Sequence, residues 1–198
     1  MSEREKTSLG HVRETITQWH GWLRGTVSED GSDAPRKGNT AALAELRRCA
    51  DARDVMLTWP FGRLVRLAFP AVEFSGVESL SRDDIAALAH TALIMSCAER
   101  AGAKPPTFGR VPRLMAQIPE GGRAPVVGRV RANVLLSSPD ADEACRSILS
   151  VMPLLGDGKP TLDPGHLYHA MRRWDHVKTD WAMDYYAALP LDEKAGAA

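Results

Sequence analysis

Cysteines are few in this chain, and their arrangement narrows the class of protein. The three residues, Cys49, Cys97 and Cys145, are an odd number and lie far apart. This spacing excludes a disulfide framework and the paired cysteines of a structural zinc site. We therefore expect reduced thiols, most of them buried.

Long hydrophobic runs are also absent. No stretch reaches the length of about 18 apolar residues that a membrane span needs. The start of the chain, Met-Ser-Glu-Arg-Glu-Lys, carries charges of both signs, and no apolar run follows it, so it does not resemble a secretory signal. We expect a soluble, cytoplasmic protein that has no membrane partner.

The motifs of familiar enzymes and metal sites are missing as well. The chain contains no Gly-x-Ser-x-Gly, no His-Glu-x-x-His and no Gly-x-Gly-x-x-Gly sequence. The Gly158-Lys159 pair lacks the glycine and the Ser or Thr that a phosphate-binding loop requires around it. His166 and His169 could share a metal ion with Asp163, but no further strong ligand completes the pattern. We expect no catalytic activity, no metal and no cofactor.

The net charge of zero hides a strong segregation of charge along the sequence. Residues 36–66 carry a net charge of +4 and residues 100–131 carry +6, whereas the other segments are acidic. Arginine supplies 19 of the 25 cationic side chains, and its planar fork can donate two hydrogen bonds to one phosphate. A chain rich in Ala and Arg is also typical of a genome of high G+C content. Composition alone therefore leaves nucleic-acid binding and ordinary surface charge equally open.

Apolar spacing predicts helices throughout, and no run shows the sustained two-residue alternation of a strand. We expect an all-α fold, a helical bundle of about nine helices, with two lobes as one possible arrangement. The expected helices span residues 11–25, 40–50, 52–58, 60–70, 82–100, 110–118, 123–136, 139–152 and 164–189.

Three helix starts are marked by a capping residue that an acid or a proline follows. They are Ser81 with Asp84 three residues later, Ser138 before Pro139, and Asp163 before Pro164. In the helix predicted after Asp163, the apolar and aromatic residues fall on one face, so we expect that face in the core or at a subunit contact. These residues are Leu167, Met171, Trp174, Trp181 and Tyr185.

Two breaks suggest how the chain is organised. The polar segment 26–37 predicts a mobile surface loop, and Pro105-Pro106 cannot continue a helix. We therefore expect an N-terminal lobe, residues 1–104, that contains the basic segment 36–66. The C-terminal lobe, residues 105–198, contains the basic segment 110–131 and the closing Trp/Tyr helix 164–189.

Arginines in both basic segments are the candidate binding residues. In the helix 40–50, Leu43 and Leu46 lie on the buried face, which leaves Arg47 and its neighbour at or near solvent. A track of arginines binds phosphates without reading base identity. The alternative is that these side chains are solvated or pair with the acidic segments. The candidates are Arg47, Arg48, Arg63, Arg66, Arg110, Arg123, Arg129 and Arg131.

Five sequence elements, in this order, resemble a known family: the small subunit (CasB type) of the type I-E CRISPR surveillance complex, Cascade. They are Trp19 or Trp22 in an early helix, Gly38 to Arg48, Pro60-Phe61-Gly62-Arg63-Leu64, Gly109-Arg110, and Trp174 to Tyr186. The chain departs from the family pattern at Asn39-Thr40, where members often carry an acidic-basic pair, and at Gly62, where an aromatic residue is common. These departures concern single contacts more than the family.

The resemblance implies a non-catalytic, all-helical subunit of an RNA-guided antiviral complex. Such a subunit is present in two copies, contacts the backbone and large subunits, and binds the CRISPR RNA and the target DNA, including the displaced strand. It would stabilise the R-loop, in which base pairing supplies the sequence and the protein supplies backbone contacts. The positions that match the family motifs are Arg47, Arg48, Arg63 and Arg110; the other four candidates follow from charge alone.

Two alternatives stay open from the residues. A free-standing helical regulator would need a recognition helix that presents polar side chains to base edges, and the arginine faces have few Asn or Gln neighbours. A purely structural subunit would direct its arginines at acidic protein surfaces. Weak salt dependence of nucleic-acid binding would favour the structural subunit.

Overall fold

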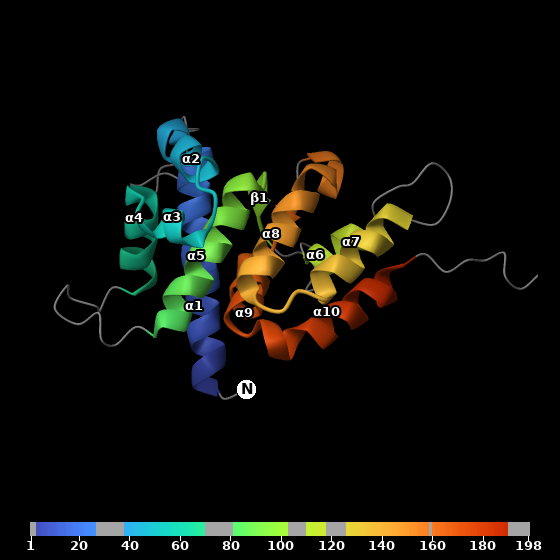
Figure 1. The fold of residues 1–198 in the computed structure, drawn as a ribbon. Coiled ribbons are helices and arrows are strands. Elements are labelled where there is room, and N and C mark those ends of the chain that lie inside the picture. The colour runs from blue at the N-terminus through green and yellow to red at the C-terminus, as the bar shows by residue number, and fades with distance from the viewer. Residues whose placement is uncertain are drawn as a thin grey trace, which may run out of the picture.

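The computed structural model describes residues 3–26, 38–69, 81–102, 110–117, 126–158 and 160–189. Ten α-helices and a very small sheet make up this part of the chain, which confirms the all-α helical bundle (Figure 1). The helices are α1 (Glu3–Arg24), α2 (Thr40–Arg47), α3 (Ala52–Met56), α4 (Trp59–Ala68), α5 (Arg82–Cys97), α6 (Val111–Ala116), α7 (Val126–Leu136), α8 (Ala141–Val151), α9 (Pro164–Arg172) and α10 (Trp174–Ala188), with a 3-10 segment η2 (Met152–Gly158).

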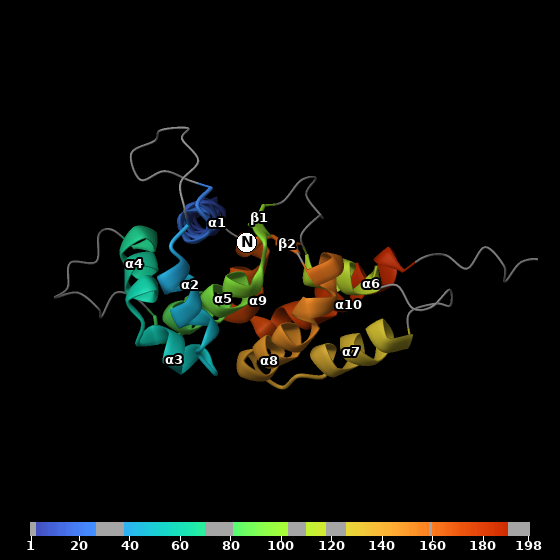
Figure 2. The same cartoon turned by 90° about the horizontal axis from the view of Figure 1, so that it is seen from above.

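Helix α5 lies at the centre of the bundle. Every residue from 87 to 96 is buried, and alanines at 87, 89 and 92 allow neighbouring helices to approach closely. It packs against α9, α3, α8 and α2. Seen from above, α5 and α9 lie between α2–α4 on one side and α6, α7 and α10 on the other (Figure 2).

Gly38, just before α2, lies close against the backbone at the end of α1. A Cβ atom at Gly38 would lie 2.5 Å from the carbonyl oxygen of Leu23, inside any normal contact, so only glycine fits here. Asn39 then caps α2, its side chain accepting a hydrogen bond from the Ala42 N–H at 3.0 Å. The start of helix α2 is therefore held against α1 by the backbone.

The closing helix 164–189 is not one helix, which corrects that part of the sequence prediction. Arg173, with φ −136° and ψ 41°, leaves the helical region and separates α9 from α10. The break lets α9 pack against α5 and α1 while α10 packs against α6 and α7, which one straight helix could not do. The predicted apolar face is nevertheless buried throughout, so Trp174, Trp181 and Tyr185 belong to the core.

The predicted caps are right in two cases and wrong in one. Ser81 accepts from the Asp84 N–H at 3.0 Å, and Asp163 accepts from the Gly165 N–H at 3.0 Å. Helix α8, however, begins two residues later than predicted, because Asp140 is the cap and accepts from the Glu143 N–H at 2.9 Å. The Ser138 hydroxyl donates instead to the carbonyl oxygen of Val134 at the end of α7, at 3.2 Å.

A two-stranded parallel sheet was not predicted. It pairs β1 (Arg100–Ala101) with β2 (Thr161–Leu162), and the helix expected to reach residue 100 ends at Cys97. Strands of two residues cannot produce a periodic pattern, so the sequence carries no sign of them. Residues 27–37 of the predicted loop and the lobe boundary at 104–105 lie outside the described residues. No helix in the described ranges is long and apolar enough to cross a membrane.

Candidate nucleic-acid interface

The two basic segments lie at opposite ends of the bundle. Helices α2 and α4, from the first segment, lie on one side of α5, and α7, from the second, lies at the far side (Figures 1 and 2). The central helices α5 and α9 therefore separate α2 and α4, with their candidate arginines, from α7.

Arg47 is directed at the C-terminal end of α5, where a second arginine joins it. Its Nε donates to the carbonyl oxygen of Ser96 at 3.2 Å. Arg24, at the end of α1, donates from Nη2 to the same oxygen at 3.3 Å and to the carbonyl oxygen of Ala98. Two guanidinium groups thus satisfy carbonyls at the negative end of the α5 dipole.

The two cations at this helix end affect one another. Partial burial lowers the pKa of Arg24, and the charge of Arg47 lowers it further, while Glu99 opposes this at 3.7 Å from Nη1. Sequence reasoning missed Arg24, because it lies in an acidic segment with no arginine next to it, and its partners are far along the chain. Arg47 therefore has a structural role, because it bonds the C-terminal end of α5, in addition to any role of its charge in binding.

Arg48, next along the chain, is exposed and free. It follows the last residue of α2, where its backbone N–H donates to the carbonyl oxygen of Glu45 at 3.1 Å, and its guanidinium group makes no hydrogen bond or ion pair with any described residue. Its guanidinium group is therefore available to a phosphate, which distinguishes it from Arg47.

Helix α4 presents an arginine pair beside two tryptophans. The Cζ atom of Arg63 lies 4.6 Å from the ring centroid of Trp22, a cation–π contact. The rings of Trp22 and Trp59 lie 5.4 Å apart at 78°. Arg66, one turn further along α4, is exposed and has no ion pair within the described ranges.

Arg110 forms an ion pair with an aspartate. This agrees with the alternative that the arginines pair with the acidic segments. Its Nη1 lies 2.7 Å from Oδ2 of Asp184 on α10, and Nη2 of Arg113 lies 3.3 Å from Oδ1. Burial works against ionisation of Asp184, but the hydrogen bond and charge of Arg110, with those of Arg113, outweigh it and lower the pKa of the carboxyl. Two arginines share one carboxylate here, so the cluster keeps one net positive charge.

The histidine next to this cluster is a packing residue. The ring of His166 stacks on that of Trp181, with centroids 5.3 Å apart and planes at 9°. Burial, followed by the charge of Arg110, lowers the pKa of His166 to about 3, so the ring is neutral. No group of three or more His, Cys, Asp or Glu side chains in the described ranges could hold a metal ion.

Helix α7 carries the remaining described candidates. Arg129 is exposed and makes no ion pair with described residues. Arg131 donates from Nη1 to the carbonyl oxygen of Ser150 at 3.1 Å, near the C-terminal end of α8. Arg123 lies outside the described residues.

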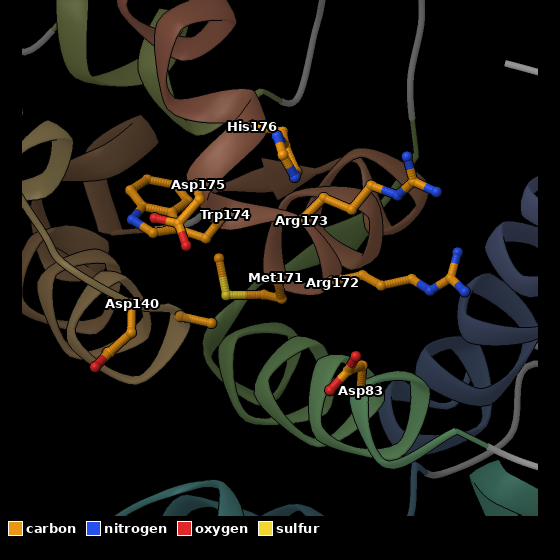
Figure 3. A pocket seen from close by; sticks show the side chains of 9 residues that line it. Asp83, Asp140, Met171, Arg172, Arg173, Trp174, Asp175 and His176 are labelled. Carbon is orange, nitrogen blue, oxygen red and sulfur yellow. The ribbon is translucent and has the colours of Figure 1, made fainter.

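A pocket of about 570 Å³ opens where α5, α8 and the α9–α10 junction meet. It is lined by carboxylates, guanidinium groups and an imidazole on Asp83, Asp140, Asp175, Arg172, Arg173 and His176. Figure 3 shows Arg172 and Arg173 extending in the same direction, away from Trp174. Arg172 also pairs with Asp84, Nε to Oδ1, at 2.6 Å. The pocket contains none of the candidate arginines, and its mixed charge does not favour a phosphate.

Comparison with protein families identifies one match. Residues 42–186 match the family described as CRISPR-associated protein Cse2. The match begins within α2, ends within α10 and includes all eight candidate arginines. No curated protein and no solved structure matches the chain.

Proposed function

The chain belongs to the Cse2 family, the small subunit of the type I-E CRISPR complex Cascade, and from this premise we propose that it binds nucleic acid there and stabilises the R-loop. Its partners would be the backbone and large subunits, the CRISPR RNA, the target DNA with its displaced strand, and a second copy of itself. Its contribution would be non-catalytic and cytoplasmic.

The observation that carries this proposal is the charge of two surface helices. Helices α4 and α7 each contain two arginines and no acidic residue. Arg66 on α4 and Arg129 on α7 are exposed, and neither has an ion pair within the described part of the chain. When such side chains bind phosphates, they release counterions from the nucleic acid, and this favours binding whatever the base sequence.

We rank the candidate arginines by whether their guanidinium groups already have a partner within the protein. The guanidinium groups of Arg48, Arg66 and Arg129 make no hydrogen bond or ion pair with described residues, so we propose these three as primary phosphate contacts. The remaining candidates contribute charge from positions that are already bonded, stacked or paired, or that lie outside the described residues. They are Arg47, Arg63, Arg110, Arg131 and Arg123.

Contacts between arginines and backbone phosphates are suited to stabilising an R-loop. The heteroduplex that forms is about as stable as the DNA duplex it replaces, so modest backbone contacts decide the balance. Arginines that bind regardless of sequence would serve any guide.

The test is R-loop lifetime in the assembled complex. We expect the Arg48→Glu and Arg66→Glu double variant to release the R-loop about tenfold faster, which corresponds to about 1.4 kcal/mol. Arg146→Glu is the matched control, because Arg146 is exposed but pairs with Glu143 on the acidic helix α8, at 3.1 Å. An unchanged lifetime in the double variant, with normal assembly, would contradict the proposal. Sequence-specific duplex binding by the isolated chain would favour a free-standing regulator.

A further inference from the structure

Trp59 is an exposed aromatic residue with a fixed orientation. It opens α4, directly after the cap Thr58, and its side chain is 51% exposed. The perpendicular contact with Trp22, at 78°, sets the plane of its ring and leaves at least one ring face uncovered by Trp22. A large aromatic ring that is both oriented and exposed to solvent is typical of a ligand-binding surface.

The charged side chains of α4 itself are all positive. Helix α4 carries Arg63 and Arg66 and no acidic residue. Arg63 already lies against Trp22, the other ring of the pair, and Arg66 is exposed two turns along from Trp59. Two further apolar residues nearby in the sequence, Leu57 and Leu67, are 88% and 40% exposed.

Tyr186 shows why this combination is unusual. It is exposed to a similar degree, 55%, but it lies on α10. That helix carries three aspartates and a single lysine, and Arg110 and Arg113, which face it, are already paired with Asp184. An exposed aromatic and a positive surface therefore coincide at Trp59 and not at Tyr186.

We propose that Trp59 is a stacking platform for an unpaired base of single-stranded nucleic acid, with the adjoining phosphate neutralised by Arg66. In a duplex both faces of each base are covered, whereas an unpaired base has a free face to lay on the indole. Stacking on an aromatic side chain is tolerant of sequence, as a guide-directed complex requires. This inference rests on the proposed function and assigns it a site for the single strand.

The test compares two probes that have the same phosphates. The full chain is titrated with labelled oligodeoxythymidylate and with an abasic oligonucleotide of equal length, and Kd is measured by fluorescence anisotropy. We expect the wild type to bind the oligothymidylate about fivefold or more tighter than the abasic strand. Trp59→Ala should remove this preference, Trp59→Phe should keep part of it, and Tyr186→Ala should leave it intact. Arg66→Gln should reduce the affinity for both probes by the same factor.

Different failures are distinguishable. Equal binding of both probes by the wild type, or a preference that survives Trp59→Ala, overturns the stacking site and leaves phosphate binding intact. Unchanged oligonucleotide binding by Trp59→Ala, together with loss of assembly into the complex, overturns it in favour of a protein contact. If the wild type binds neither probe, both the stacking site and the proposed function are wrong. Unfolding curves establish that the variants are folded.

Discussion

Neighbouring arginines in this chain have different roles. Arg47 caps α5 together with Arg24, whereas the guanidinium group of Arg48 makes no hydrogen bond or ion pair with a described residue. Arg110 is paired with Asp184, whereas Arg66 has no such partner in the described ranges. A formal count of positive charges therefore overstates what is available to a phosphate. The useful quantity is how many guanidinium groups lack an internal partner.

The Asp184 cluster makes a prediction about stability and pH. The pKa of Asp184 is lowered on folding, so the carboxylate stabilises the protein above its usual pKa of 3.8, and this contribution is lost as pH falls through the lower folded value. Asp184→Asn should cost about 1.5–3 kcal/mol at neutral pH, the range for hydrogen bonds to charged groups. Urea unfolding at neutral and at acid pH measures this difference, which should shrink in acid.

Asp180→Asn is the control for that prediction. Asp180 lies on the same helix, but it is exposed and has no ion pair with a described residue. Its substitution should change stability by less than about 0.5 kcal/mol. If both substitutions had the same effect, the pairing with Arg110 and Arg113 would have no energetic weight.

At the scale of elements, packing decides where helices start, stop and turn. Helices α9 and α10 share one apolar face in the sequence, yet the chain breaks at Arg173 because the two halves pack on different neighbours. Asp140 displaces Ser138 as the cap of α8 in a similar way, because the Ser138 hydroxyl is engaged by the end of α7. Local signals place these helices within a few residues, and their neighbours fix the boundaries.

Two glycines predict opposite effects of the same substitution. Gly62 lies mid-helix on the exposed side of α4, and a Cβ atom there would meet nothing within 4 Å. Gly62→Ala should therefore stabilise the protein by about 0.5–1 kcal/mol, because alanine loses less backbone entropy in a helix. Gly38→Ala should destabilise it, because the Cβ would lie 2.5 Å from the Leu23 carbonyl oxygen. Thermal unfolding of the two variants checks both signs, and a stable Gly38→Ala protein would contradict the packing of α2 on α1.

At the scale of the whole molecule, the central helix α5 separates two positive surfaces. One lies on α2 and α4 and the other on α7, at the two ends of the bundle (Figure 1). A strand that runs past the subunit could therefore contact both ends, and substitutions at the two ends should act independently.

This arrangement predicts an additive salt effect. Arg66→Gln and Arg129→Gln should each reduce the slope of log affinity against log salt concentration by about one, and the double variant should reduce it by about two. Titrations with a single-stranded oligonucleotide over a range of salt concentrations measure these slopes. If Arg129→Gln had no effect, strand binding would be confined to the α2–α4 end.

Motifs spread along the chain indicate the family, and local patterns predict the helical fold, the buried face of the last two helices and two of three marked caps. These features depend on neighbours within about four residues along the chain, which periodicity and capping rules describe. The packing of distant helices brings Arg110 to Asp184, lets Arg24 and Arg47 share the Ser96 carbonyl, and turns the chain at Arg173. The hydrogen bonds among those contacts join residues from 49 to 74 positions apart, and no local pattern records which distant helices will pack together.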